Sequence, residues 1–588
     1  MSDSIEIRRR PRANHFSEAS FHPVLQRVYD ARQIRHKRQL DRELKRLIPF
    51  TGLMNIDAAA QLLYQALKRQ QKILVVGDFD ADGATSSALA VRALKAFGCQ
   101  QVDFLVPNRF EFGYGLTPEI VEVACRHSPQ LLITVDNGIS SIEGVARARD
   151  AGIEVLVTDH HLPGERLPDA SVIVNPNQQG DAFPSKHLAG VGVIFYVMLA
   201  LRSLLREQGW FAAQGITEPN MAQFLDLVAL GTVADLVPLD ENNRILVYQG
   251  IQRIRRGGAC AGIQALLRVS RRTAPRLVAA DLGFALGPRL NAAGRLQDMA
   301  LGIACLLTDE FTEALAMAEE LDTLNLQRRQ IEAEMKAAAD QSLAQIRVGD
   351  KALPPGLCLF DSNWHQGVIG ILASRLKEKY HRPVIVFADD ADQGLLKGSA
   401  RSIPGLHMRD LLDRIAVSHP GLIRKFGGHA MAAGLSLAVD DFSRFRQAYY
   451  QALESQLSAE MLQQVLLTDG ELQAADLNLE LAQLLREAGP WGQGFPEPVF
   501  EGSFILIAQR VVGEKHLKLS LKPDAGDQQV DAIAFNQASL QAGPGAELYL
   551  AYRLDVNEFN GRRSAQLIVE HLYVKQASLA RTPEPADS

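Results

Sequence analysis

The chain has 588 residues, of which 47% are hydrophobic and 22% charged, and its formal net charge is -6. This length is too great for a single hydrophobic core, so three or four domains are expected. No apolar run reaches the roughly 18 uncharged residues that a membrane span needs, which predicts no membrane association. The chain begins without an apolar signal core and its five cysteines have no paired spacing, so a cytoplasmic protein is expected.

Residues 1–50 are predicted to form a basic N-terminal segment, although the chain as a whole is acidic. Arginines stand at positions 8, 9, 10 and 12, and a second basic stretch runs from 32 to 46. Such a segment either contacts a polyanion or forms a solvated tail and helix face, and the sequence favours neither interpretation.

Short β-branched runs alternate with helical patterns between residues 51 and 308. This alternation implies parallel βαβ units. The predicted strands are 72–76, 102–106, 131–135, 154–157 and 172–174. The first strand leads into a predicted helix at 84–97, for which Asp82 is a candidate N-cap. Functional sites of open α/β sheets form at the carboxyl edge, where the loops that leave the strands converge.

The rest of the chain predicts three further parts and a tail. Residues 309–348 contain almost no Gly or Pro and predict one long connecting helix. Residues 349–460 show a second α/β pattern, with strands at 357–360, 384–387 and 396–400. Residues 461–576 contain five predicted strands, which suggest a small β-barrel, and the tail at 577–588 is predicted to be disordered. The predicted fold class is therefore α/β with an added barrel.

Acidic side chains collect where the predicted strands end. Carboxylates gathered in this way repel one another unless a cation lies between them. The candidate metal ligands are Asp78, Asp80, Asp82, Asp136, His160 and Asp235, and Asp159 stands beside them. Any one of these acids alone would be equally typical of a turn or cap. Oxygen ligands with an imidazole suit Mn²⁺ or Mg²⁺ better than zinc, and two such ions about 3.5 to 4 Å apart stabilise both reacting oxygens of a phosphodiester.

Several further motifs have the composition of phosphate and base contacts. Arginine clamps a phosphate, aromatic rings stack on bases, and helix N-termini with backbone N–H groups favour anions. The candidate substrate-binding residues are Arg109, Tyr114, Arg289, Asn291, Arg295, His365, Ser399, Arg401, His429 and Lys518. The alternative for each motif is a packed loop, an ordinary turn or a half-buried strand. Trp491 and Phe495 are left open between base stacking and packing.

Four motifs in order resemble the DHH phosphoesterases: VVGDFDADG at 75–83, TVDNG at 134–138, TDHH at 158–161 and VAD at 233–235. The resemblance is closest to the bacterial branch that degrades single-stranded DNA from the 5′ end. It implies a DHH domain, a DHH-associated domain at 349–460 that closes over the active site, and an oligonucleotide-binding (OB) barrel. It also implies that two Mn²⁺ or Mg²⁺ ions are bound, with Asp136 as the bridge.

The same resemblance implies roles for the remaining site residues. Asp78 is assigned to the ligand set, although Val76 stands where many relatives have a histidine. His161 and Asp159 are assigned to catalysis: His161 faces the phosphate, and Asp159 orients a neighbouring imidazole. Ser399 and Arg401 are expected to contact the 5′ end.

The resemblance implies a processive exonuclease that releases 5′-mononucleotides from single-stranded DNA in recombination, base-excision repair and mismatch repair. A single-strand-binding protein and a DNA helicase are expected partners, and a monomer is the expected state. One alternative is a DHH phosphodiesterase acting on oligoribonucleotides or cyclic dinucleotides, but such relatives usually lack the barrel. Another is an inactive DNA-binding replication scaffold, which the intact acids and histidines disfavour.

Overall fold

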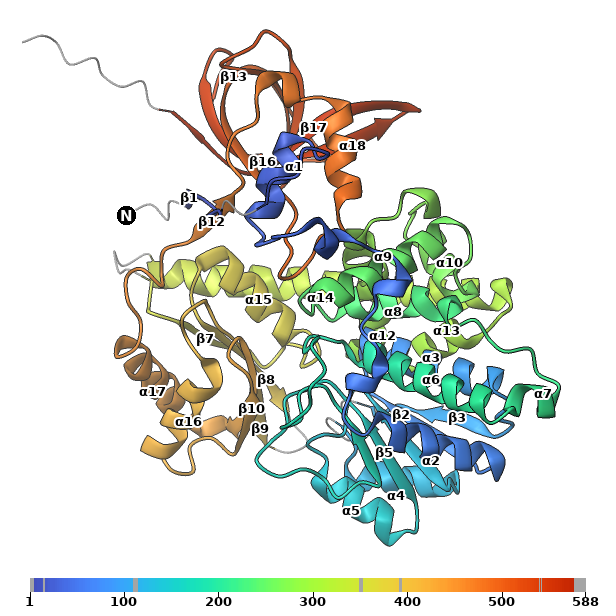
Figure 1. The fold of residues 1–588 in the computed structure, drawn as a ribbon. Helices are drawn as coiled ribbons and strands as arrows, with labels where there is room; N and C mark the ends of the chain where they lie inside the picture. The colour runs from blue at the N-terminus through green and yellow to red at the C-terminus, as the bar shows by residue number, and fades with distance from the viewer. Residues whose placement is uncertain are drawn as a thin grey trace, which may run out of the picture. The chain divides into compact units, whose positions relative to one another are not determined.

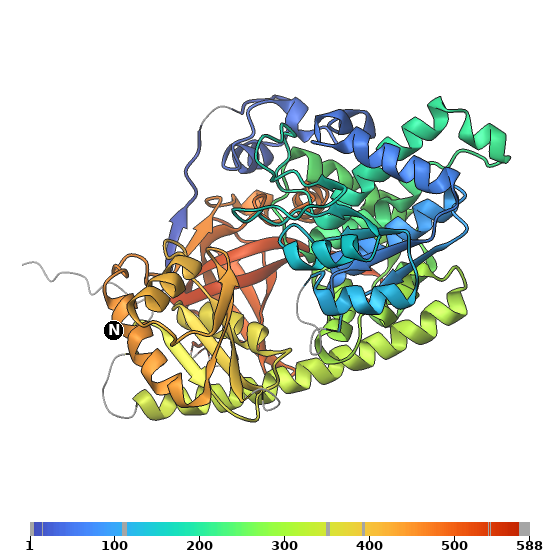
Figure 2. The same ribbon diagram turned by 90° about the horizontal axis from the view of Figure 1, so that it is seen from below.

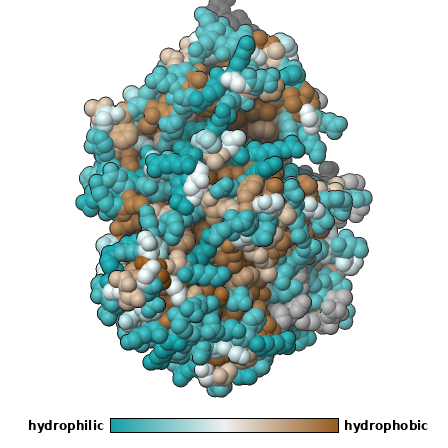
Figure 3. Space-filling model, turned by 90° about the vertical axis from the view of Figure 1, so that its right-hand side faces the viewer, coloured by the Kyte–Doolittle hydropathy of each residue, from teal (hydrophilic) through white to brown (hydrophobic). Residues whose placement is uncertain are grey.

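The computed structural model describes residues 5–13, 16–108, 115–347, 353–390, 394–538, 540 and 542–575. The predicted tail at 577–588 lies outside them. The chain divides into two units, one formed by residues 1–41 with 465–588 and the other by residues 42–464 (Figure 1). In the part that is described, no helix combines the length and the apolar character needed to cross a membrane. Hydrophilic residues cover most of the face in Figure 3, with hydrophobic residues interspersed.

The larger unit begins with a five-stranded parallel sheet of strand order β3-β2-β4-β5-β6. Its strands are β2 (Ile73–Gly77), β3 (Val102–Leu105), β4 (Leu131–Val135), β5 (Glu154–Thr158) and β6 (Val172–Val174). Strands β2 and β4 are buried along their whole length, as expected where helices cover both faces. The predicted parallel sheet is confirmed.

Helices flank this sheet on both sides (Figure 1). They are α2 (Ile56–Lys68), α3 (Ala81–Ala96), α4 (Pro118–Arg126), α5 (Ile142–Asp150) and α6 (Gly190–Glu207). Apolar side chains of α4 and α5 form one hydrophobic cluster with alternate residues of β2 and β4, including Leu74, Val76 and Leu132. This cluster fixes the face of the sheet that lies away from α3 and α6.

A helical part follows the sheet. It contains α7 (Trp210–Gln214), α8 (Leu225–Ala234), α9 (Glu241–Arg255), α10 (Ala261–Val269), α11 (Ala279–Asp281), α12 (Gly287–Leu296) and α13 (Ala300–Leu307). A π-helical turn at Leu282–Leu286 leads directly into α12. The predicted connecting helix is α14 (Phe311–Arg347), which Figure 2 shows as one long yellow-green helix. Its 37 residues span about 55 Å at 1.5 Å per residue.

The last part of the larger unit is a mixed sheet of strand order β10-β11-β9-β8-β7. Its strands are β7 (Leu357–Phe360), β8 (Val384–Asp390), β9 (Leu395–Arg401), β10 (Lys425–Gly428) and β11 (Ala432–Ala438). Helices α15 (Ile369–Tyr380), α16 (Met408–Ser418) and α17 (Phe442–Glu454) accompany it. Strands β10 and β11 were not predicted, because their glycines and alanines have low β-propensity.

The smaller unit contains a closed five-stranded barrel of strand order β13-β14-β15-β17-β16. Its strands are β13 (Phe500–Val512), β14 (His516–Pro523), β15 (Val530–Ala534), β16 (Glu547–Phe559) and β17 (Arg562–Val574), with α18 (Leu479–Ala488) beside them. Leu517, Leu519 and Leu521 of β14 are buried, while the residues between them are partly exposed. The predicted barrel and its alternation are confirmed.

The N-terminal segment is part of the same smaller unit. Strand β1 (Glu6–Arg9) pairs in parallel with β12 (Val465–Thr468), and α1 (Pro23–Asp30) follows it. The Tyr29 ring stacks on Phe495 with a centroid distance of 6.4 Å, and Phe495 stacks on Trp491 at 5.0 Å. Trp491 and Phe495 therefore take part in packing, the second of the two possibilities left open by the sequence.

A buried ion pair joins this segment to the barrel side of the unit. The Arg32 guanidinium donates to both carboxylate oxygens of Asp469 at 2.8 and 3.2 Å, and to the carbonyl of Pro496 at 2.8 Å. The two side chains are 1% and 0% exposed. Removal of one partner would leave an uncompensated buried charge.

We expect Arg32→Met to destabilise the smaller unit by about 3 kcal/mol, because Asp469 would stay buried with only Arg10, 4.0 Å away, as a nearby cation. Hydrogen–deuterium exchange of residues 465–523 would measure the loss as faster exchange. Arg35→Met is the control, since Arg35 is exposed. Equal exchange in both variants would contradict a stabilising role for the pair.

Candidate metal centre

The strand register brings three acidic residues into one row. Gly77 is paired with Val135, and Val135 with Thr158, so these residues are the last paired positions of β2, β4 and β5. The next residue of each strand is an aspartate: Asp78, Asp136 and Asp159. All three are buried. The parallel sheet thus places the acidic runs that the sequence separates by 20 to 60 positions at one edge.

Asp80 caps the helix that follows β2. Its carboxylate accepts hydrogen bonds from the backbone N–H groups of Asp82 at 2.9 Å and Gly83 at 3.0 Å. Helix α3 therefore begins at Ala81, and the expectation that Asp82 would cap a helix starting at residue 84 is wrong. The earlier start turns Asp82 into a residue of the first helical turn.

Asp82 is held by the N-terminus of a second helix. The N–H groups of Gly190 and Val191, at the start of α6, donate to its two carboxylate oxygens at 2.6 and 2.9 Å. The positive end of the helix dipole favours the carboxylate there. Gly190 also lies against Asp136, because a Cβ at this position would come within 2.5 Å of the Asp136 Cβ. Neither Gly190 nor Val191 could be recognised from the sequence, since nothing in Ala-Gly-Val-Gly marks a contact with a distant acid.

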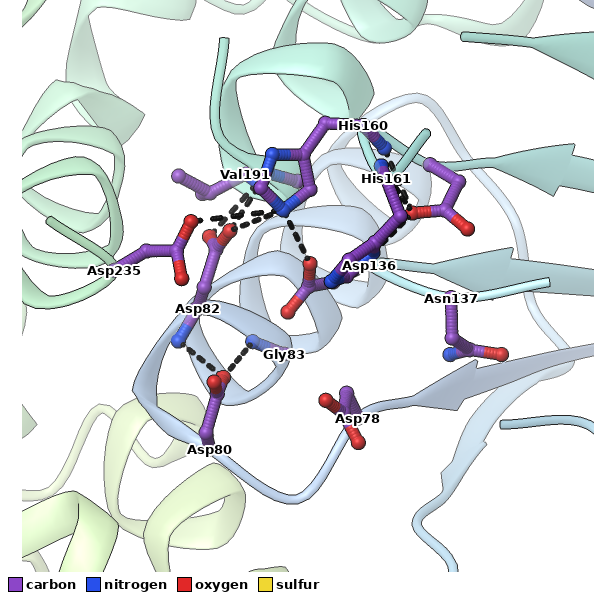
Figure 4. A network of polar contacts seen from close by, with 12 residues as sticks. Asp78, Asp80, Asp82, Gly83, Asp136, Asn137, His160, His161, Val191 and Asp235 are labelled. Atoms are coloured by element: carbon purple, nitrogen blue, oxygen red, sulfur yellow. Dashed lines mark hydrogen bonds and ion pairs between the residues drawn. The ribbon is translucent and has the colours of Figure 1, made fainter. Parts of the chain in front are cut away.

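His160 lies at the centre of the acids. Its Nε2 is 3.0 Å from an Asp136 oxygen, 3.5 Å from Asp235 and 3.9 Å from Asp82 (Figure 4). This nitrogen is buried and accepts or donates no hydrogen bond among the described residues. Burial, together with the nearby charge of His161, lowers the pKa of His160 to about 4. The imidazole is therefore neutral, which is the state that binds a metal ion.

Burial and mutual repulsion disfavour the ionised acids when no cation is present. Burial and the charge of Asp80 raise the pKa of Asp82 to about 7. Burial and neighbouring aspartates, Asp82 first among them, raise the pKa values of Asp136 and Asp235 well above the usual range. Divalent cations would reverse both effects.

Three groups of side chains have ligand atoms within 4.8 Å of one another: Asp78, Asp80, Asp136; Asp82, His160, Asp235; and Asp136, His160, His161. Asp136 belongs to two of these groups, as a bridging carboxylate would. The donor set is oxygen with imidazole and contains no thiolate, which fits Mn²⁺ or Mg²⁺. The third group shows that His161 is also within reach of an ion.

Asp159 points at its neighbours rather than at the other acids. It accepts hydrogen bonds from the backbone N–H of Ile139 at 2.9 Å and of His160 at 2.7 Å, and its Oδ1 lies 2.7 Å from Nδ1 of His161. Burial lowers the pKa of His161, but the hydrogen bond to Asp159 and the charge of Asp159 outweigh this effect. The pKa of His161 is therefore raised to about 9. Asp159 thus fixes the orientation of the His161 ring and keeps a proton on Nδ1.

Helix α12 contacts the loop between β2 and α3, which carries Asp78 and Asp80. The Asn291 side-chain oxygen accepts from the backbone N–H of Ala81 at 2.7 Å, and a Cβ on Gly294 would come within 1.9 Å of the Phe79 carbonyl. Arg289 donates to the carbonyl of Ala285 at 2.6 Å and pairs with Asp322 of α14 at 2.8 Å. Asn291 and Gly294 therefore position the loop that carries Asp80.

The second sheet presents a cation without an acidic partner. Arg401 donates to the hydroxyls of Ser399 at 3.0 Å and Ser374 at 3.1 Å, and no described carboxylate pairs with it. Burial lowers the pKa of Arg401, which shows that its charge is poorly compensated. Gly370, in the first turn of α15, lies against Ser399 and Arg401. This combination of cation, hydroxyls and helix N-terminus suits a phosphate.

Two histidines of this part connect it to the metal centre. Nδ1 of His365 accepts from the N–H of Gly367 at 3.0 Å, and the carbonyl of Gly367 accepts from Arg295 of α12 at 3.2 Å. Burial lowers the pKa of His429, and the charge of His161 lowers it further. The Gly-Gly-His turn therefore lies within electrostatic range of His161.

The remaining candidates are placed differently. Lys518 of β14 pairs with Asp531 of β15 at 2.8 Å. Arg109 and Tyr114 lie outside the described residues.

Comparisons with known proteins agree with this architecture. The DHH family N-terminal domain matches residues 72–232, the DHHA1 domain residues 353–455, and the RecJ OB domain residues 468–571. The single-stranded-DNA-specific exonuclease RecJ of Dickeya dadantii is 55% identical over 97% of this chain and 99% of its own length. The RecJ of Escherichia coli is 53% identical over 97% and 100%. The chain belongs to the RecJ family.

Two solved structures of a family member were determined with divalent ions. RecJ from Thermus thermophilus in complex with Mn²⁺ superposes with a TM-score of 0.78 at 30% identity, covering 98% of this chain and 81% of that chain. The complex of the same protein with Mg²⁺ gives 0.74 at 28% identity, covering 98% and 80%. The predicted cofactors are confirmed by these ions and by the ligand groups around Asp136 and His160.

We expect Gly190→Ala to lower the nuclease rate about 100-fold, because the new Cβ would displace Asp136 and Asp82 by a fraction of an ångström or more. Initial rates on labelled single-stranded DNA would measure the loss. Gly164→Ala is the matched control, since a Cβ there meets no atom closer than 3.9 Å. A Gly190→Ala protein with the wild-type rate would show that the close contact does not position the ligands.

Proposed function

We propose that this protein is a metal-dependent exonuclease that degrades single-stranded DNA from the 5′ end and releases 5′-mononucleotides. The observation that carries the proposal is the group of acids around Nε2 of His160, which lies 3.0 Å from an Asp136 oxygen, with Arg401 of the second sheet of the same unit beside two serine hydroxyls. The family relationship supports single-stranded DNA as the substrate, since the RecJ proteins most similar to this chain are named for that specificity.

The contacts of the residues support the following roles. Asp78, Asp80, Asp82, Asp136, His160 and Asp235 would hold two ions. When bound, the ions supply Lewis-acid stabilisation of the charge that develops on the phosphodiester. His161, protonated and oriented by Asp159, donates a hydrogen bond to a phosphate oxygen or a proton to the leaving oxygen. Asp159 acts as a positioning residue in this scheme.

The polarity of the enzyme is proposed to come from the Arg401 site. A terminal 5′-phosphate carries more charge than a phosphodiester and can accept hydrogen bonds on more oxygens. Arg401, Ser399 and the start of α15 together offer donors for such a group. His365 and His429 flank this part of the site, and Arg295 ties it to α12.

We propose that each part of the chain has its own role in the reaction. Residues 51–308 carry the metal centre, 349–460 hold the 5′ end, the helix at 309–348 connects them, and 461–576 bind the DNA strand downstream. A single-strand-binding protein and a DNA helicase are proposed as partners in recombination and repair, and a cytoplasmic monomer as the working form. The DNA substrate and the five free cysteines support that location.

Strands with one blocked end test the proposed polarity. We expect a 3′-blocked strand to be degraded and a 5′-blocked strand to resist, because only a free 5′ end can enter the Arg401 site. Gel analysis of end-labelled DNA with Mn²⁺ or Mg²⁺ would measure this. Asp136→Asn is the control for contaminating nucleases, since Asn tolerates the positive φ of 62° at this position. Faster loss of the 5′-blocked strand would contradict the polarity, and preferential cleavage of RNA would contradict the substrate.

We expect Arg401→Ala to reduce the preference for a 5′-phosphate over a 5′-hydroxyl by about tenfold or more, because a charge-assisted hydrogen bond is lost. The ratio of kcat/KM on the two substrates would measure it. Arg424→Ala is the control, since Arg424 is exposed on the same part of the chain. An unchanged ratio would remove Arg401 from the 5′-end site.

A further inference from the structure

The basic residues at the start of the chain form a pocket that the metal centre does not use. A cavity of about 300 Å³ in the smaller unit is lined by Arg9, Arg10, Arg12, Arg27, Asp469 and Glu471, with Ala31, Gly470 and Gln473 completing the wall. At about 30 Å³ per water, it holds the equivalent of about ten water molecules, which is room for a phosphate and its sugar.

Backbone pairing builds this pocket from two distant segments. Strand β1 lies in parallel register with β12, so that Arg9 is opposite Thr468, and the N–H of Arg10 donates to the Thr468 carbonyl at 2.8 Å. Arg27 of α1 donates to the carbonyl of Glu471 at 2.8 Å. Arg9, Arg10 and Arg27 are therefore held by paired or helical backbone.

The two acids of the pocket are already occupied. Glu471 pairs with Arg9 at 2.6 Å, and Asp469 pairs with Arg32 at 2.8 Å and lies 4.0 Å from Arg10. Arg9 also contacts Glu501. No described carboxylate lies within ion-pair distance of Arg12 or Arg27. Four arginines against two acids leave a formal excess of two positive charges in the lining.

Two guanidinium nitrogens of the pocket also lack hydrogen-bond partners among the described residues. Nε of Arg10 and Nε of Arg27 are buried and make no hydrogen bond to any described residue. Burial lowers the pKa values of both groups; the charge of Asp469 raises them in part, and nearby arginines lower them. Burying these guanidinium groups costs free energy, and an oxyanion in the cavity would supply a compensating negative charge.

We propose that this arginine pocket binds a backbone phosphate of single-stranded DNA and anchors the strand at a site separate from the metal centre. The proposal rests on the proposed function for its substrate. Guanidinium forks match phosphate oxygens, and Ala31 is the one apolar side chain of the lining, whereas a protein partner would require an apolar contact surface. The pocket is also distinct from the alternating face of β14, because none of its residues belongs to that strand.

Salt-dependent DNA binding tests the proposal. Binding of a long labelled oligothymidylate would be followed by fluorescence anisotropy in the full-length, inactive Asp136→Asn protein. We expect Arg12→Gln to weaken binding several-fold and to reduce the slope of log Kd against log salt concentration by about 0.7, the value for one lost phosphate contact on a single strand. Arg10→Gln combined with Arg12→Gln should weaken binding further while the slope falls by about the same 0.7, because both arginines would contact one phosphate. Arg12→Lys should restore the slope.

Arg8→Gln is the matched control. Arg8 belongs to the same strand as Arg9 and also pairs with a glutamate, Glu6 at 2.9 Å, but it is 59% exposed and does not line the pocket. It should bind DNA as the parent does. Because Arg12 is exposed, its substitution leaves the fold intact, and the catalytically active variants should still cleave a dinucleotide, too short to reach a second site, at the wild-type rate.

Each remaining outcome overturns the proposal. If the wild type binds and cleaves DNA and the arginine variants bind it with the same affinity and slope, the pocket is not a phosphate site while the proposed function stands. If the variants lose a labelled acidic peptide but keep DNA, the pocket binds protein. If the wild-type protein neither binds nor cleaves single-stranded DNA, the proposed function has failed together with the inference.

Discussion

The repulsion between buried carboxylates is the constraint on which the larger unit depends. Asp78, Asp80, Asp82 and Asp136 lie at adjacent strand ends, and burial together with their mutual charge raises the pKa of Asp82 to about 7. Such a cluster costs free energy unless cations lie among the oxygens. Divalent ions would therefore stabilise an arrangement that is unfavourable without them. Binding of the ions is thus coupled to the rigidity of the loops around the site.

Backbone amides and close helix contacts keep the cluster in place. Two N–H groups at the start of α6 hold Asp82, two at the start of α3 hold Asp80, and Asn291 of α12 holds the loop between them. These contacts fix the ligands before an ion arrives, so little ordering is left for the bound state. Arg295 extends the same arrangement to the second sheet through the Gly367 carbonyl, which links the metal centre to the residues around Arg401.

The smaller unit contains a local excess of positive charge. Its N-terminal segment is built into the same unit as the barrel by strand pairing, by the Tyr29, Trp491 and Phe495 rings, and by the buried Arg32–Asp469 pair. Most of the acids near the segment are used in these structural pairs. The arginines left over face a cavity, so an acidic protein of net charge -6 presents a local positive site.

The sequence predicted the parallel sheet, the long helix, the barrel and the acids of the candidate metal centre, because hydrophobic periodicity and acids at strand ends are local signals. It missed Gly190 and Val191, strands β10 and β11, and the true start of α3 at Ala81. The family resemblance had already implied that Asp159 orients an imidazole, but the support that Asn291 gives to the loop carrying Asp80, and the place of the basic N-terminus beside the barrel, appear only in the structure. These depend on contacts between segments up to several hundred residues apart, which no local pattern encodes.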